Sequence, residues 1–196
     1  MTKAEATRLS ILQKSFELIY VKGYQTTSID DILATTQVTK GAFYYHFKNK
    51  DEMGLAIIDE LLKPSFAASF MKPLQSGTDP VKVIYDMMHG ILMKNDFMKV
   101  EHGCPAANLT LEMAPWHNDF TKALNDLSEE WKNAIEQCIK NGKKSGNIRA
   151  DVKPEQVAVF IMSGYWGIRN MGKLTNSKTV YLIYLKQLKD YLPSLH

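Results

Sequence analysis

The sequence contains little cysteine and no long hydrophobic run. Its 196 residues include Cys104 and Cys138, which lie far apart and form no CxxC pair, so neither a disulfide framework nor a zinc site is predicted. No apolar run approaches the roughly 18 residues that a transmembrane helix requires. The opening MTKAEATRLS lacks the charged-then-apolar pattern of a signal peptide. We therefore expect a soluble cytoplasmic protein with reduced thiols, no membrane association and no bound metal.

Motifs of common enzyme classes are also absent. No histidine belongs to an HExxH motif or an i, i+4 pair, and there is no GxSxG turn. The segment Gly167–Leu174 has the spacing of a phosphate-binding loop, but Leu174 stands where the motif needs Ser or Thr, and no strand pattern precedes it. His102 lies near Cys104 without another ligand nearby in the sequence, so no metal or redox site is indicated there. We expect no enzymatic activity and no cofactor.

The net positive charge is small, and residues 1–50 account for all of it. The formal net charge of +3 neither requires nor excludes a nucleic-acid partner. Residues 1–50 contain seven Lys or Arg and four Asp or Glu, so their surplus equals that of the whole chain. Such a small basic surplus fits a domain that makes a few phosphate contacts per half-site.

Two short helices joined by a turn are predicted within residues 26–50. Ser28 followed three residues later by Asp31 has the pattern of a capping box and should begin the first helix. The β-branched and polar residues 35–38 interrupt the helical period, and Thr39 can cap a second helix. Because many helical proteins contain two short helices joined by a turn, the pattern alone leaves a purely structural role open.

The second of these helices carries residues suited to binding DNA. Its first turn consists of small or flexible residues that can approach a base edge. A polar and aromatic rim and lysines follow, placed to meet phosphates. We assign base contacts to Thr39, Lys40, Gly41 and Tyr45, and phosphate contacts to Thr27, Tyr44, His46 and Lys50.

Residues 38–51, VTKGAFYYHFKNKD, closely resemble the DNA-binding signature of the TetR/AcrR family of bacterial transcriptional regulators. The positions that match the family pattern are Gly23, Tyr24, Thr26, Thr27, Ile32, Gly41, Tyr44, His46, Phe47 and Lys50. Beyond about the first quarter of the chain, only helix pattern and length are similar. The resemblance implies a three-helix DNA-binding domain at residues 1–50 ahead of a larger effector-binding and dimerisation domain at residues 51–196.

The whole chain reads as an all-α fold of about nine helices. A first helix is expected from Lys3 to Lys22, and a long helix should run from Asn49 toward Pro64. Residues 72–80 read as a loop, after which proline opens the next helix at its first position. Further helices are expected at about 106–113, 118–141, 154–168 and 177–192.

Methionine and aromatic residues are frequent in the segments that line ligand cavities in the resembled family. Methionine adapts to varied apolar shapes and Tyr or Trp adds a polar group, which favours a small apolar or aromatic effector. Core packing is the simpler explanation for any single one of these residues. The candidate ligand-binding residues are Met93, Phe97, Met113, Trp116, Trp131, Met162, Tyr165 and Trp166, with Asn108, Glu112 and Arg169 as polar residues that could orient the ligand.

These features together predict a homodimeric transcriptional regulator. The last two helices resemble the dimer interface of the family, and a two-fold dimer reads two half-sites about one helical turn apart. We expect a repressor that leaves a palindromic double-stranded DNA operator when a small-molecule effector binds. An activator or corepressor-dependent regulator of the same fold stays open, as does a helical carrier or enzyme with a vestigial DNA-binding head.

Overall fold

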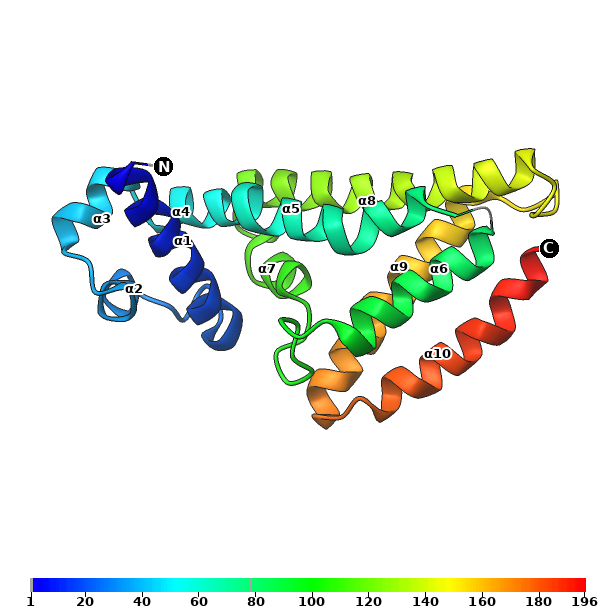
Figure 1. The fold of residues 1–196 in the computed structure, drawn as a ribbon. Coiled ribbons are helices and arrows are strands. Elements are labelled where there is room, and N and C mark those ends of the chain that lie inside the picture. Colours follow the sequence, from blue (N-terminus) through cyan, green and yellow to red (C-terminus); the bar gives the residue numbers. More distant parts are fainter. Residues whose placement is uncertain (1, 78) are drawn as a thin grey trace. The chain divides into compact units, whose positions relative to one another are not determined.

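The computed structural model describes residues 2–77 and 79–196, in which all regular structure is helical (Figure 1). The α-helices are α1 (Lys3–Lys22), α2 (Ile29–Thr36), α3 (Lys40–His46), α4 (Lys50–Ile57), α5 (Lys63–Phe66), α6 (Pro80–His89), α7 (Pro105–Met113), α8 (Asn118–Lys144), α9 (Pro154–Thr175) and α10 (Thr179–Tyr191). With uninterrupted helical segments counted together, the described residues form nine helices, and the all-α prediction is confirmed. In that same part of the chain, no helix combines the length and the apolar character needed to cross a membrane.

The helix that begins at Lys50 continues to Gln75, so its expected end near Pro64 is wrong. A proline ring normally clashes with the carbonyl four residues earlier. We attribute the continuation to the π-helical turn that directly precedes α5, because such a turn is wider and displaces that carbonyl. The run consists of α4, a π-helical turn at Ile58–Leu62, α5, a second π-helical turn at Ala67–Met71 and a 3₁₀ turn at Lys72–Gln75.

The chain divides into two compact units. The first is the chain up to Pro64 together with Pro105–Asn125, and the second is Ser65–Cys104 together with Asp126–His196. These units are defined by their compactness and not by what they bind. The division into a DNA-binding domain at residues 1–50 and an effector-binding domain at residues 51–196 therefore stays a prediction.

Apolar side chains from α1 to α4 and from α8 form the core of the first unit. Its fully buried members include Ile11, Leu12, Ile32, Phe43, Phe47, Met53 and Phe120. Gly54 on α4 makes the closest approach, because a Cβ there would lie 2.7 Å from both the Phe120 and the Tyr24 rings. Glycine at this position therefore lets α4 pack against these two aromatic side chains.

The second unit contains a hairpin of α9 and α10. Asn176 adopts the left-handed conformation, with φ of 47°, and ends α9 just before α10 begins. A Cβ at Gly172 would lie 2.5 Å from the Tyr181 ring, and one at Gly164 would contact Tyr184. These glycines thus allow the two helices of one chain to pack closely.

Candidate functional site

Local hydrogen bonds set the ends of the two short helices. Ser28 Oγ accepts the Asp31 N–H at 3.1 Å while the Asp31 carboxylate accepts the Ser28 N–H at 2.8 Å, which is the predicted capping box. The Lys22 ammonium, 2.8 Å from Asp31, and Ser28 hold the pKa of the Asp31 carboxyl below its usual range. Thr39 Oγ1 accepts the Ala42 N–H at 3.2 Å. Both predicted helix starts are therefore confirmed.

Helix α3 buries Phe43 and exposes most of the predicted base-contact residues. Phe43 is fully buried, whereas Lys40 and Gly41 are exposed and Tyr45 is 77% exposed. A Cβ added at Gly41 would meet no atom within 4 Å. Lys40 has no ion-pair partner in the described part of the chain. This face thus offers a cation, a flat glycine surface and an aromatic hydroxyl to a partner.

Two residues assigned to phosphate contacts already have partners within the protein. Thr27 is buried, and its hydroxyl donates to the Gly23 carbonyl at 2.6 Å. The Lys50 ammonium donates to the carbonyls of Tyr24 and Thr27, both at 3.0 Å, and lies 4.5 Å from the centre of the Tyr24 ring. Burial lowers the pKa of Lys50. Contact with phosphate by either side chain would require these bonds to break, and their assignment stays a prediction.

The remaining candidate phosphate residues lie at the end of α3. Tyr44 is exposed, and half-buried His46 packs edge-on against Tyr45 with ring centres 4.9 Å apart. Lys48 is exposed, and its ammonium forms no ion pair within the described part of the chain. Lys48 is thus better placed than Lys50 for a phosphate, and its position directly after the helix was the signal in the sequence.

A polar cluster fixes the turn between α1 and α2. The buried Tyr24 hydroxyl donates to Asp51 at 2.6 Å, and burial together with this carboxylate raises the pKa of the tyrosine. His117 Nε2 lies 3.7 Å from the other Asp51 oxygen. Glu112 on α7 accepts the Gln25 N–H at 2.9 Å. The turn before α2 is therefore held by side chains from both α4 and the segment 105–125.

The ligand candidates of the first unit are not gathered around a ligand-sized space. Asn108 and Glu112 line a cavity of about 10 Å³, which is the space of about one water molecule. Met113 is buried, whereas Trp116 is 80% exposed. Glu112, expected to orient a ligand, is instead bonded to the backbone of the α1–α2 turn.

The aromatic candidates of the second unit form part of its core. Trp131 and Tyr165 are buried and pack edge-to-face at 5.3 Å, and Phe70 contacts both rings. The indole Nε1 of Trp131 is buried without a hydrogen-bond partner among the described residues. Met162 is also buried, while Phe97 and Trp166 are exposed and Met93 is half-buried. Core packing accounts for the buried members of this set.

Arg169 is a buried structural residue rather than a free ligand-binding group. Its guanidinium donates to the carbonyls of Met98 at 3.2 Å, Lys99 at 3.2 Å and Gly103, and it lies 5.5 Å from the centre of the Tyr181 ring. These bonds hold the irregular segment between residues 98 and 103 against α9. The expectation that Arg169 orients an effector does not fit this geometry.

Replacing Arg169 with Met should lower the free energy of unfolding by about 2–4 kcal/mol, because the substitution leaves buried carbonyls without donors. Urea unfolding followed by circular dichroism measures this change. Arg149→Met is the matched control, since Arg149 is exposed and pairs with Asp151 at the surface, where an ion pair contributes about 0–1 kcal/mol. Equal losses in the two variants would contradict the structural role of Arg169.

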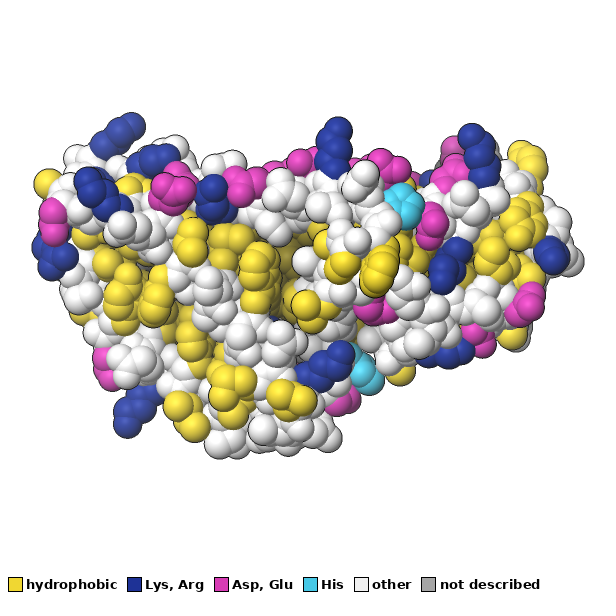
Figure 2. All heavy atoms as spheres, turned by 180° about the vertical axis from the view of Figure 1, so that it is seen from behind, with side chains coloured by type: hydrophobic (Ala, Val, Ile, Leu, Met, Phe, Trp, Pro, Cys, Tyr) yellow, Lys and Arg dark blue, Asp and Glu magenta, His cyan; other side chains and the backbone are white. Residues whose placement is uncertain are grey.

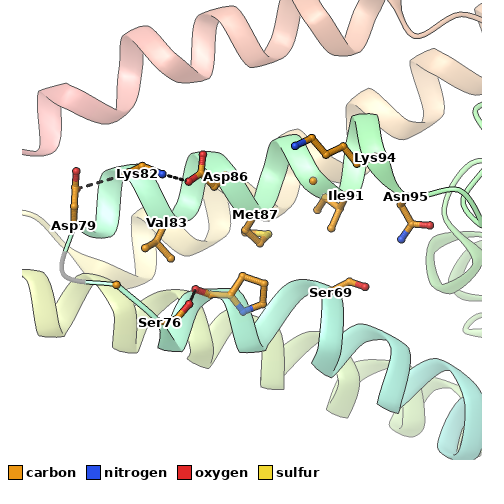
Figure 3. A pocket seen from close by; sticks show the side chains of 13 residues that line it. Ser69, Ser76, Asp79, Lys82, Val83, Asp86, Met87, Ile91, Lys94 and Asn95 are labelled. Atoms are coloured by element: carbon orange, nitrogen blue, oxygen red, sulfur yellow. Dashed lines mark hydrogen bonds and ion pairs between the residues drawn. The ribbon is translucent and has the colours of Figure 1, made fainter.

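A larger cavity lies in the second unit, between residues 69–77 and the helix that begins with α6 (Figure 3). Its volume is about 650 Å³, within the range of small-molecule sites. None of the eleven candidate ligand residues lines it. The signal in the sequence was the spacing of Val83, Met87 and Ile91, which places the three on one helix face.

Neither cysteine has the surroundings of a reactive or metal-binding group. Cys138 lines a cavity of about 210 Å³, and burial raises the pKa of its thiol to about 11, so almost none of it is thiolate at neutral pH. Cys104 is also buried. No cluster of His, Cys, Asp and Glu with metal-binding geometry occurs in residues 2–77 and 79–196.

Comparison with known proteins identifies relatives of both parts of the chain. Residues 11–57 match the family described as bacterial regulatory proteins, tetR family, and residues 77–188 match the tetracyclin repressor-like C-terminal domain. An uncharacterized HTH-type transcriptional regulator in the lacX 3' region of Lactococcus lactis is 35% identical over 133 residues, 68% of each chain. The HTH-type transcriptional repressor DhaR of Mycobacterium sp. strain GP1 is 25% identical over 82% of this chain and 79% of its own.

Solved structures share the fold along nearly the full length. A TetR-family transcriptional regulator from Cytophaga hutchinsonii superposes with a TM-score of 0.87 at 23% identity, covering 100% of this chain and 98% of its own. The reduced form of E. coli NemR gives a TM-score of 0.83 at 21% identity, covering 94% and 96%.

Proposed function

Since the chain belongs to the TetR family of DNA-binding transcriptional regulators, we propose that it is a homodimeric repressor that a small molecule releases from a palindromic operator. The observation that carries the proposal is the exposed face of α3. Lys40, Gly41 and Tyr45 on this face are exposed and take no part in the core of the first unit. Two relatives are named as repressors, DhaR and E. coli NemR, and they support repression rather than activation. Binding to operator DNA places the protein in the cytoplasm and requires no enzymatic activity.

In this proposal the first turn of α3 enters the major groove. Thr39, Lys40, Gly41 and Tyr45 contact base edges, while Tyr44, His46 and Lys48 contact phosphates. Lys50 and Thr27 contribute by holding the α1–α2 turn, as their hydrogen bonds indicate. Lys40 determines sequence preference because its ammonium can donate to guanine acceptors.

An apolar surface on α9 and α10 supports the homodimer. Most exposed large apolar side chains of the second unit belong to these two helices, and Figure 2 shows hydrophobic side chains gathered on this face. Exposed apolar patches of this kind mark protein interfaces. They are Val159, Phe160, Trp166, Met171 and Leu174 on α9 and Leu182 and Ile183 on α10.

Selection of bound sequences from random DNA tests the proposed function. The wild type should enrich a palindrome with half-sites about one helical turn apart. Lys40→Ala should weaken binding to that site by about 1–3 kcal/mol and relax preference at particular base pairs. Lys48→Ala removes the same charge but should weaken binding equally for all sequences and flatten its salt dependence. If no sequence is enriched, the DNA-binding head is vestigial and the proposal fails.

A further inference from the structure

The cavity of about 650 Å³ in the second unit has an apolar floor. Met87 and Ile91 are buried, and Val83 lies one turn before them. In Figure 3 these three side chains point from α6 and the π-helical turn that follows it toward the chain segment that carries Ser69 and Ser76. The three apolar residues follow one another along the helix, so the floor is elongated and suits an extended apolar group.

Both walls of this cavity depart from regular α-helical geometry. Ser69 belongs to the π-helical turn Ala67–Met71, and Gly90, Ile91 and Lys94 belong to the π-helical turn Gly90–Lys94. Such turns are rare and occur frequently at functional sites. Their presence on both sides of one cavity distinguishes it from an ordinary surface groove.

Hydrogen-bond donors gather at one end of the cavity. The Asn95 side-chain oxygen accepts the N–H groups of Phe97 at 3.1 Å and Met98 at 3.0 Å, which leaves its amide nitrogen as a fixed donor on the cavity side (Figure 3). Lys94 is exposed at this end and has no ion-pair partner among the described residues.

The other charged side chains of the cavity have ion-pair or hydrogen-bond partners. Lys82 pairs with Asp86, and Asp79 Oδ1 accepts the N–H groups of Val81 and Lys82 at the start of α6. Among the described residues that line the cavity, Lys94 is thus the cation without an ion-pair partner. An ammonium and an amide donor that line the same cavity can each bind a carboxylate oxygen, and a charge-assisted hydrogen bond is stronger than a neutral one.

We propose that this cavity is the effector site and that its ligand is an elongated apolar carboxylate, with the carboxylate at Lys94 and Asn95 and the apolar chain along Ile91, Met87 and Val83. The inference rests on the proposed function for its regulatory meaning. The wall of residues 69–77 contains the C-terminal end of the helical run that begins at Lys50, the residue that holds the α1–α2 turn. A ligand that pushes residues 69–77 away from α6 would therefore move the helix that leads to the DNA-binding domain.

Calorimetry with the full chain and octanoate as the probe tests the site. Octanoate should bind, and octan-1-ol should bind about tenfold more weakly because it lacks the charge. Lys94→Met should weaken octanoate binding by about tenfold and remove its advantage over the alcohol. Lys144→Met is the matched control, because Lys144 is exposed and does not line the cavity, and it should leave octanoate binding unchanged.

A blocking variant tests the location without disturbing the fold. A Cβ at Gly90 would meet no atom within 4 Å, and Gly90 lines the cavity, so Gly90→Phe should fill the space and abolish octanoate binding. Gly90→Ala should fold equally well and bind octanoate within about twofold of the wild type. Absence of octanoate binding, or binding that survives both Gly90→Phe and Lys94→Met, overturns the site.

Release of the selected operator is measured separately. Octanoate should release the wild-type protein from DNA but leave Gly90→Phe bound. If octanoate binds the cavity and DNA stays bound, the regulatory role of the cavity is overturned. If no DNA sequence is selected at all, the proposed function fails. The calorimetry still shows whether octanoate binds in the cavity.

Discussion

Gly41→Glu should abolish operator binding and leave the fold intact. A side chain at this position meets no protein atom within 4 Å, and a residue other than glycine stabilises a helix by about 0.5–1 kcal/mol. On DNA, the added carboxylate would occupy the space of a base edge and repel the phosphates on either side. We expect affinity for the selected operator to fall by about a hundredfold or more, which is about 3 kcal/mol or more.

Gly41→Ala and Gly54→Ala separate binding from folding in this test. The first adds a methyl group in open space on α3, and should raise the melting temperature while it weakens DNA binding less than Gly41→Glu. The second adds a methyl group 2.7 Å from the Tyr24 and Phe120 rings, and should lower the melting temperature. Gel-shift titration and thermal unfolding measure the two effects. If Gly41→Glu binds the operator within about threefold of the wild type, the first turn of α3 does not contact bases.

Local patterns in the sequence predicted the short helices correctly. The caps at Ser28 and Thr39 are hydrogen bonds between residues three apart, so the sequence contains all the information they need. The helix end expected at Pro64 failed for a different reason. Whether proline ends a helix depends on the conformation of the turn that precedes it. The residue types of Ile58–Leu62 do not predict that this turn is π-helical.

Side-chain partners far apart in sequence were not predictable in the same way. Lys50 was assigned to phosphate because it follows the helix, but its ammonium binds carbonyls 26 and 23 residues earlier. Arg169 was chosen as a polar residue among apolar ones, and it binds the carbonyl of Gly103, 66 residues away. A buried basic residue that binds carbonyls has the same sequence pattern as one that binds a ligand.

Composition did not predict the larger cavity of the second unit. Trp131 and Tyr165 were predicted to bind a ligand because large aromatic residues are common in ligand sites, yet both pack in the core. The cavity of about 650 Å³ is lined by less conspicuous residues such as Ser69, Val83 and Asn95. Whether an apolar side chain lines a space or fills one depends on packing between distant segments, which residue type alone does not determine.

Ile183→Asp should convert the proposed dimer to a monomer and reduce operator affinity by about a hundredfold or more, because one DNA-binding domain reads one half-site. Ile183 is 66% exposed on α10, and in a two-fold interface one substitution removes apolar contact twice and buries two carboxylates. Sedimentation and gel-shift titration measure both effects.

Val21→Asp makes the same kind of change on α1, at a side chain that is 63% exposed, and should leave the protein dimeric. It thereby controls for the general effect of placing a carboxylate on an exposed apolar position. Because Ile183 is exposed in the single chain, its replacement should not lower the stability of the monomer. Loss of DNA binding with unchanged helical content would therefore indicate loss of the interface. If both Ile183→Asp and Leu182→Asp remain dimeric, the interface does not lie on α10. If a stable monomer binds the operator, recognition does not require a two-fold dimer.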